Sequence, residues 1–349
     1  MDANLTTLPT TGIYLDKPLP PTQDPALVYL NHFESAKSRY TQSRVVLAIA
    51  SWLNRDPRLI NWSAFTHEHN AAIQNRAVQF FKPATARKYQ AALRGIAESA
   101  WVLGHMTAEA YQRAVRLPTI KGKSRRKDRF VSQGEINAIM DACISYPSPA
   151  GPRDAVIIAL TYMALIRREG IINLDLEDYQ EVEKDGRRVG QLIVHYKGGD
   201  DDTAYLTGEA HFAINDWLAI RGSKPGPLLL RVSQLGRLVY TGHKAPGRPH
   251  TRHEGKEDWA DRLSDQAVYV IVKKRAEQAG VKNISPNVFR HTGIGRMLKN
   301  KVDLVTVSHI AHHKSVQTTG GYDPRGDEEK IEGASSLHIK WIPRTISPA

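Results

Sequence analysis

The sequence has little of what marks secreted and membrane proteins. Cys143 is the only cysteine in 349 residues, so no disulfide can form within the chain and a reducing compartment is expected. The longest apolar run, residues 155–166, is shorter than the roughly 20 residues that a membrane-spanning helix needs. Residues 1–23 have Asp2 in place of a basic start and lack the pattern of a signal or transit peptide. These absences argue against a disulfide-stabilised or membrane-spanning protein and favour the cytoplasm.

Negative charge is also scarce, and unevenly so. The net charge is +12, and residues 1–128 hold 18 Lys and Arg against 9 Asp and Glu. Eight cations between residues 113 and 129 face only Asp128. This run, which also contains Pro118 and Gly122, suits phosphate binding, although a solvated connector between two domains would have the same composition. The candidate phosphate-binding cations of the run are Lys121, Lys123, Arg125, Arg126 and Lys127.

Before this basic run the pattern is helical. Apolar residues recur at three- and four-residue spacing over residues 43–52, 62–80 and 85–103, which predicts a small all-helical bundle. The third of these helices has exposed cations that are candidates for phosphate contact, although each alone could equally be a solvated charge. They are Arg87, Lys88 and Arg94.

The rest of the chain predicts a second, mostly helical domain with a small antiparallel β-sheet. Ser132 and Glu135 have the spacing of a capping box at a helix start, and residues 155–166 read as a buried helix. Residues 175–205 predict short strands with turns at 185–186 and 198–199. Three histidines in a later polar stretch are too loosely spaced to predict zinc, so no metal site is expected. They are His243, His250 and His253.

Near the C-terminus, the order of Arg290, His313 and Tyr322 fits nucleophilic attack by a tyrosine on an anionic target. A phenol ionises near pH 10, so a tyrosine nucleophile needs cations that hold the target anion and stabilise the phenolate. The two glycines at residues 320–321 make one continuous helix from His313 to Tyr322 improbable. We therefore expect His313 to end one element and a separate element to carry Tyr322.

These motifs resemble those of the tyrosine recombinase (phage integrase) family, of the simple two-domain type found in Cre-like and Xer-like enzymes. The resemblance covers most of residues 129–330. Arg167, within residues 164–174, matches the first arginine of the family, and Lys197, within residues 195–199, matches its lysine. Arg290 matches the second arginine, His313 the late histidine and Tyr322 the nucleophile. Four motifs in the expected order are far more specific than any one of them.

The chain departs from the family pattern at several positions. Asn287 stands where the His-x-x-Arg motif begins with histidine, and an amide can bind a phosphate oxygen but cannot exchange a proton near neutral pH. Glu169 and Gly170 stand in reversed order, which leaves open which carboxylate orients the first arginine. His312 replaces a glycine, and His291 is expected to support Arg290 by packing.

The resemblance implies cleavage of DNA through a 3′-phosphotyrosine at Tyr322, without a cofactor. Arg167 and Arg290 would stabilise the charge on the phosphate, because guanidinium groups offer planar pairs of donors. Lys197 would protonate the leaving 5′-oxygen. Asn287 would contact the phosphate, and His313 would bind it and help Tyr322 to lose its proton.

The resemblance also implies a domain plan and partners. The expected segments are a flexible tail (1–25), a helical core-binding domain (26–117), a basic linker (118–128), a catalytic domain (129–330) and a tail for subunit contacts (331–349). The expected partner is double-stranded DNA with a short, roughly palindromic core site, bound by a dimer, with a tetramer in synapsis, in a prokaryotic cytoplasm and nucleoid. Integration, excision and resolution all remain open. A catalytically silent DNA-binding regulator and a type IB topoisomerase-like enzyme are the alternatives.

Overall fold

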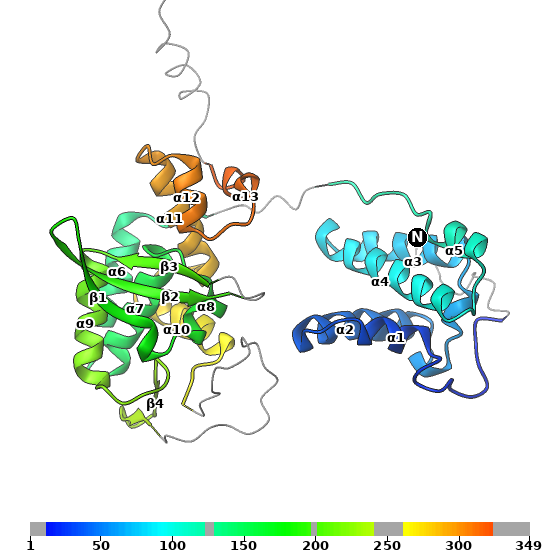
Figure 1. Cartoon of the computed structure of the whole chain (residues 1–349), viewed down its shortest axis with the longest axis horizontal. Coiled ribbons are helices and arrows are strands. Elements are labelled where there is room, and N and C mark those ends of the chain that lie inside the picture. Colours follow the sequence, from blue (N-terminus) through cyan, green and yellow to red (C-terminus); the bar gives the residue numbers. More distant parts are fainter. Residues whose placement is uncertain (1–11, 123–128, 197–200, 241–260, 324–349) are drawn as a thin grey trace, which may run out of the picture. The chain divides into compact units, whose positions relative to one another are not determined.

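The computed structural model describes residues 12–122, 129–196, 201–240 and 261–323 (Figure 1). The chain divides into two compact units, with the boundary between Lys127 and Asp128. Among the described residues, no helix is long and apolar enough to cross a membrane.

The N-terminal unit is all-helical, as predicted. Its main helices are α1 (Pro25–Asn31), α2 (Ala36–Trp52), α3 (His67–Phe80), α4 (Pro83–Val102) and α5 (Ala108–Val115), with 3₁₀ turns at Pro57–Leu59 and Trp62–Ala64. The predicted helix over residues 43–52 begins seven residues earlier, and its first turns carry no buried residue. This absence of an apolar face explains why the hydrophobic pattern did not reveal them.

The core of this unit also includes residues that were expected to lie in a flexible tail. Ile13 is fully buried in the helical core, and Tyr14 forms an isolated β-bridge with Ile60. At the other end, the amides of Gln74 and Gln90 both donate to the carbonyl of Pro118, at 2.9 Å. The helical bundle therefore contacts the chain both before α1, at residues 13–14, and after α5, at Pro118.

The C-terminal unit is mainly helical with a small sheet, which confirms the predicted fold class. Its helices are α6 (Gln133–Ile144), α7 (Ala150–Tyr162), α8 (Arg168–Asn173), α9 (Glu209–Arg221), α10 (Asp265–Gln278), α11 (Pro286–Lys299), α12 (Leu304–Ile310) and α13 (Val316–Gly320). A 3₁₀ turn spans Leu176–Asp178. The capping box of Ser132 and Glu135 is present at the start of α6, as the sequence predicted.

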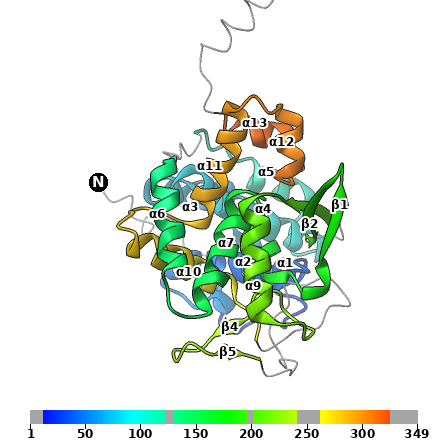
Figure 2. The ribbon, with the colours of Figure 1, turned by 90° about the vertical axis from the view of Figure 1, so that its left-hand side faces the viewer.

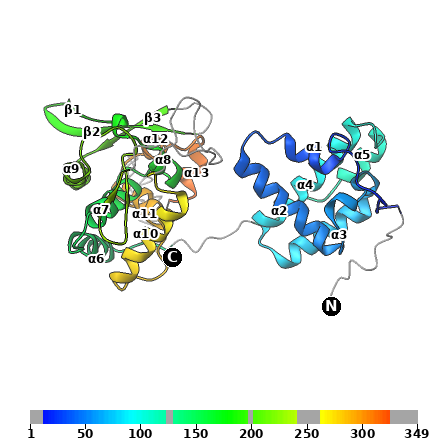
Figure 3. The ribbon, with the colours of Figure 1, turned by 90° about the horizontal axis from the view of Figure 1, so that it is seen from below.

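Helix α7 forms the centre of this unit. All residues from Arg153 to Thr161 are buried, and Figure 3 shows α7 with the sheet on one side and α6 and α10 on the other. The buried carboxylate of Asp154 binds both Arg153 and Arg275, each with a nitrogen to oxygen distance of 2.7 Å. Because the charges are paired, these ionic groups can remain in an apolar core.

The sheet is antiparallel in the order β1 (Tyr179–Lys184), β2 (Arg187–His195), β3 (Asp201–Leu206). The predicted turn at Asp185 and Gly186 joins the first two strands, and both residues have positive φ, 51° and 71°, as two-residue hairpins favour. The turn predicted at residues 198–199 lies outside the described residues. A second, two-stranded sheet pairs β4 (Arg231–Val232) with β5 (Leu238–Val239).

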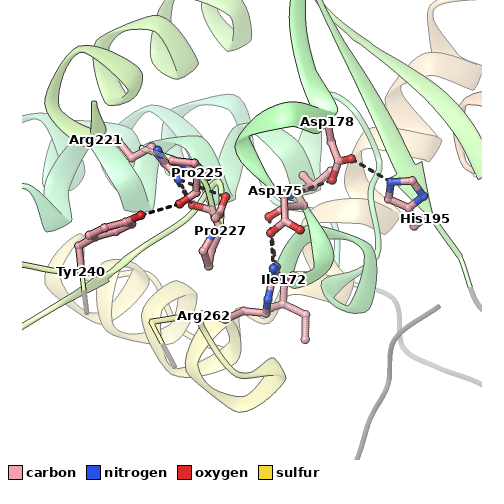
Figure 4. Close-up of polar contacts among 11 residues, drawn as sticks. Ile172, Asp175, Asp178, His195, Arg221, Pro225, Pro227, Tyr240 and Arg262 are labelled. Atoms are coloured by element: carbon pink, nitrogen blue, oxygen red, sulfur yellow. Dashed lines mark hydrogen bonds and ion pairs between the residues drawn. The ribbon is translucent and has the colours of Figure 1, made fainter. Parts of the chain in front are cut away.

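Buried polar contacts fix the segment between α8 and β2 (Figure 4). Arg262 donates to the carbonyl of Ile172 at 2.6 Å and pairs with Asp175. Asp178 receives the amide of Asp175 at 2.8 Å and binds Nε2 of His195 at 2.9 Å. The end of β2 is therefore held in a defined position.

Helices α11, α12 and α13 lie together at one end of the unit (Figure 2). Their shared core contains Leu165, Ile294 and Leu298, and Tyr322 packs against it. Gly293 lies so close to the end of α7 that an added Cβ would stand 2.2 Å from the carbonyl oxygen of Tyr162. This close approach brings Arg290 on α11 near the loop that carries Arg167.

Candidate active site

Arg167 is delivered by the turn that follows α7. Leu165 adopts a left-handed conformation with φ of 52°, and the chain then extends into Arg167, the residue that precedes α8. Arg167 is exposed, and its guanidinium donates to the carbonyl oxygen of His312 at 2.9 Å.

Arg290 lies one residue before His291 on α11 and is only 5% exposed. Its Nη2 donates to the carbonyl oxygen of Ala311, so Arg290 and Arg167 donate to two consecutive carbonyl groups. Burial, followed by the positive charge of Arg167, lowers the pKa of Arg290 to about 10, which still leaves it charged at neutral pH. The two guanidinium groups thus form a concentrated positive charge beside the segment that contains His313.

His313 and Tyr322 do not share one continuous helix, as predicted, but the break lies at residues 311–315, and Gly320 is the last residue of α13. His313 follows α12, and its Nδ1 lies 2.7 Å from the hydroxyl of Thr319. Tyr322 follows α13, and its ring stacks on that of His313 with centroids 5.6 Å apart. Burial, then Arg290 and Arg167, lowers the pKa of His313 to about 4, so its ring is neutral at pH 7 and has an acceptor nitrogen.

A cleft of about 630 Å³ opens beside these residues. Its lining includes Arg167, Tyr196, Asp202, His312, His313 and Lys314. Sequence analysis did not select Tyr196 or Asp202. Tyr196 is the neighbour of Lys197, which sequence analysis selected. Asp202 binds Nδ1 of His312. Nothing in the sequence connects these two residues, because they lie 110 residues apart.

Two of the selected residues are not part of this described geometry. Asn287 is exposed at the second position of α11, one helical turn before Arg290 and on the same face. Lys197 lies outside the described residues.

The candidate DNA-binding cations of α4 are exposed, but two of them already have partners in their own unit. Arg87 donates to the carbonyl oxygens of Ile120 and Gly122, at 3.0 and 2.6 Å for Nη2. Arg94 donates to the carbonyl of Leu117 at 3.3 Å. Lys88 and Lys121 are exposed. The other candidates, Lys123, Arg125, Arg126 and Lys127, lie outside the described residues.

No group of three or more histidine, cysteine, aspartate or glutamate side chains in the described ranges is arranged to hold a metal ion. His243, His250 and His253 lie outside those ranges.

Comparisons with known proteins identify the family of this chain. Residues 129–328 match the Phage integrase family. The chain is 28% identical over 258 residues to a tyrosine recombinase of Synechocystis sp., covering 72% of this chain and 71% of the relative. It is 22% identical over 255 residues to the tyrosine recombinase XerC of Corynebacterium glutamicum, covering 73% and 72%.

A solved structure shares the fold. The XerH site-specific recombinase bound to palindromic difH substrate has a TM-score of 0.55 and 16% identity, covering 90% of this chain and 78% of that chain. The family match and the curated relatives define an enzyme that breaks and rejoins DNA strands through a covalent tyrosine intermediate. The chain belongs to the phage integrase family, the tyrosine site-specific recombinases.

Proposed function

We propose that this recombinase attacks a DNA phosphate with Tyr322 and holds that phosphate with Arg167 and Arg290. The observation that carries the assignment is the pair of donations from these arginines to the adjacent carbonyls of Ala311 and His312, at 2.9 Å for Arg167. Displacement at phosphorus places negative charge on the non-bridging oxygens, which guanidinium donors stabilise best when they are already in position. The backbone that they bind leads directly into His313.

The other roles follow from the order of events. The oxygen of Tyr322 bonds to phosphorus as the bond to the 5′-oxygen breaks, and neutral His313, stacked on Tyr322, helps the phenol to lose its proton. Lys197 gives the 5′-oxygen its proton. Asn287 contacts the phosphate through its amide. The phosphotyrosine retains the bond energy, so a 5′-hydroxyl of a second duplex can reverse the step without a cofactor.

We further propose the domain plan and the partners. A core-binding domain (expected at 26–117), a basic linker (118–128) and a catalytic domain (129–330) would bind double-stranded DNA, and the boundary of the two units at Lys127 supports the start of the catalytic domain. The core of the N-terminal unit also contains Ile13 and Ile120, so this unit extends beyond residues 26–117. XerH is bound to a palindromic substrate, which supports a roughly palindromic core site occupied by a dimer. Strand exchange between two duplexes then requires a tetramer, with residues 331–349 making the subunit contacts.

A covalent capture experiment tests this function. The chain is incubated with a library of random duplexes that carry nicks, so that a short product diffuses away and the enzyme stays attached to DNA. Denaturing gels should show a 3′-linked adduct, Tyr322→Phe should bind DNA without forming one, and sequencing of the adduct should reveal the core site. An adduct that persists with Tyr322→Phe would overturn the assignment of the nucleophile. A chain that binds DNA but forms no adduct would instead be the silent regulator.

A further inference from the structure

His312 has a backbone conformation that suits glycine. Its φ is 49°, in the left-handed region where a Cβ is unfavourable. The turn between α12 and α13 therefore carries a side chain at a position where glycine would be less strained. Residues held in this way concentrate at functional sites, so the contacts of the side chain show what it contributes.

The imidazole of His312 is oriented by a partner from a different element. Its Nδ1 pairs with the carboxylate of Asp202 on β3, and only 4% of the His312 side chain is exposed, against 50% for Asp202. The ring also lies against that of Tyr196, with centroids 5.0 Å apart. With Nδ1 engaged by a carboxylate, Nε2 is the atom that remains for other chemistry.

Nε2 of His312 is one of three buried polar atoms in and next to the residues of this cleft that have no hydrogen-bond partner among the described residues. The other two are the hydroxyl of Tyr196 and Nη1 of Arg290. Arg290 and Tyr196 interact electrostatically, and Arg290 also acts on His312. A buried polar atom without a partner is unfavourable, and the hydroxyl and the guanidinium can both donate to one anion.

With Nδ1 bound to Asp202, Nε2 of His312 can donate to the same anion only when it also carries a proton. Burial is the main cause that lowers the pKa of His312, Asp202 opposes it, and the charges of Arg290 and Arg167 lower it further. A phosphate bound to these arginines would offset their positive charge. The imidazolium would then be favoured, because an added negative charge nearby stabilises the protonated form.

We propose that His312, oriented by Asp202, is a catalytic residue that takes up a proton from solvent when the DNA phosphate binds and donates from Nε2 to a phosphate oxygen. This role rests on the proposed function and deepens it. It supplies, from a different turn of the chain, the exchangeable proton that Asn287 cannot supply. Asp202 is a positioning residue, because it acts through the imidazole.

The test uses His312→Gly in the full chain, with a nicked duplex that carries the core site recovered by covalent capture. Glycine suits a φ of 49° but loses the imidazole contacts with Asp202 and Tyr196, so urea denaturation checks that the variant is folded under the assay conditions. Adduct formation should slow by roughly 10²-fold, as for the loss of one transition-state donor, while DNA binding is retained. Free imidazole in the buffer should restore much of the rate, because it can enter the space left in the cleft.

His312→Asn is the matched control. Asparagine tolerates a left-handed conformation but occupies part of the space and cannot carry the proton, so this variant should be slow and gain less from imidazole than His312→Gly. A fast His312→Gly enzyme would overturn the inference, as would a slow one that imidazole leaves unchanged, since the side chain would then be structural. In both cases the wild type would still form its adduct. A wild type that forms no adduct would instead refute the proposed function.

Discussion

The imidazole of His291 lies edge-on against the ring of Tyr322, with centroids 4.3 Å apart and an angle of 62° between the planes. His291 directly follows Arg290 on α11, so a single helical turn places the guanidinium that we propose binds the phosphate and supports the proposed nucleophile. Sequence analysis expected His291 to support Arg290. The structure adds that its ring packs on the tyrosine.

Removing this ring should slow cleavage without weakening DNA binding. His291→Ala leaves a gap beside Tyr322, and a small misplacement of a reacting group can cost up to about 10²-fold in rate. His291→Phe keeps an aromatic ring at the same position and should retain most of the rate. Single-turnover adduct formation measures both variants. Equal losses in the two would show that the polar atoms of the imidazole matter, and not its packing.

Substitution of the two arginines that we propose bind the phosphate should affect the stability of the chain to different degrees. Arg167→Ala and Arg290→Ala should each lower the cleavage rate by roughly 10²–10³-fold. Arg290 is buried and satisfies the carbonyl of fully buried Ala311, so its loss should also cost about 1–3 kcal/mol of unfolding free energy. Because Arg167 is exposed, Arg167→Ala should change the free energy of unfolding little. Urea denaturation of both variants tests the difference, and equal destabilisation would contradict the burial argument.

Sequence reasoning predicted the fold class because helix starts, such as the capping box at Ser132, and buried runs, such as residues 155–166, are local signals. The motifs also selected Arg167, Arg290, His313 and Tyr322 in advance, and the structure places these four close together. The contact of Asp202 with His312 was not predictable, because it depends on how β3 meets the turn after α12. The hydrogen bonds of Arg87 with the backbone at Ile120 and Gly122 are likewise tertiary contacts of an exposed cation.

The low pKa of His313 predicts how stability depends on pH. In the folded chain the ring protonates only near pH 4, whereas an unfolded histidine protonates near 6.5. Between these values the unfolded state binds more protons, so the free energy of unfolding should fall as the pH is lowered from about 6.5 to 4. His313→Asn cannot titrate and should show a weaker fall over this range. Urea denaturation at a series of pH values compares them, and identical slopes would disprove the shift.

Asn287→His tests the altered His-x-x-Arg motif. Asn287 is exposed near the start of α11, so histidine should be tolerated without loss of stability. Because position 287 lies on the same face as Arg290, the new imidazole should reach the phosphate and keep or raise the cleavage rate. Asn287→Ala, which removes the amide, should lower the rate. If neither change affects cleavage, Asn287 does not contact the phosphate.

The basic run should control the salt dependence of DNA binding. Each lysine or arginine that binds a phosphate releases counterions from the DNA. Replacing Arg125, Arg126 and Lys127 with glutamine should therefore reduce the slope of log affinity against log salt concentration by about one unit for each phosphate-binding cation removed. Lys88→Gln should act in the same way, since its side chain is exposed on α4. Arg87→Gln should instead destabilise the N-terminal unit, because that guanidinium holds the carbonyls of Ile120 and Gly122. Affinities measured between 50 and 200 mM salt, a range over which several bound phosphates change binding by about 10³–10⁵-fold, give the slopes. An unchanged slope in the triple variant would make the run a connector alone.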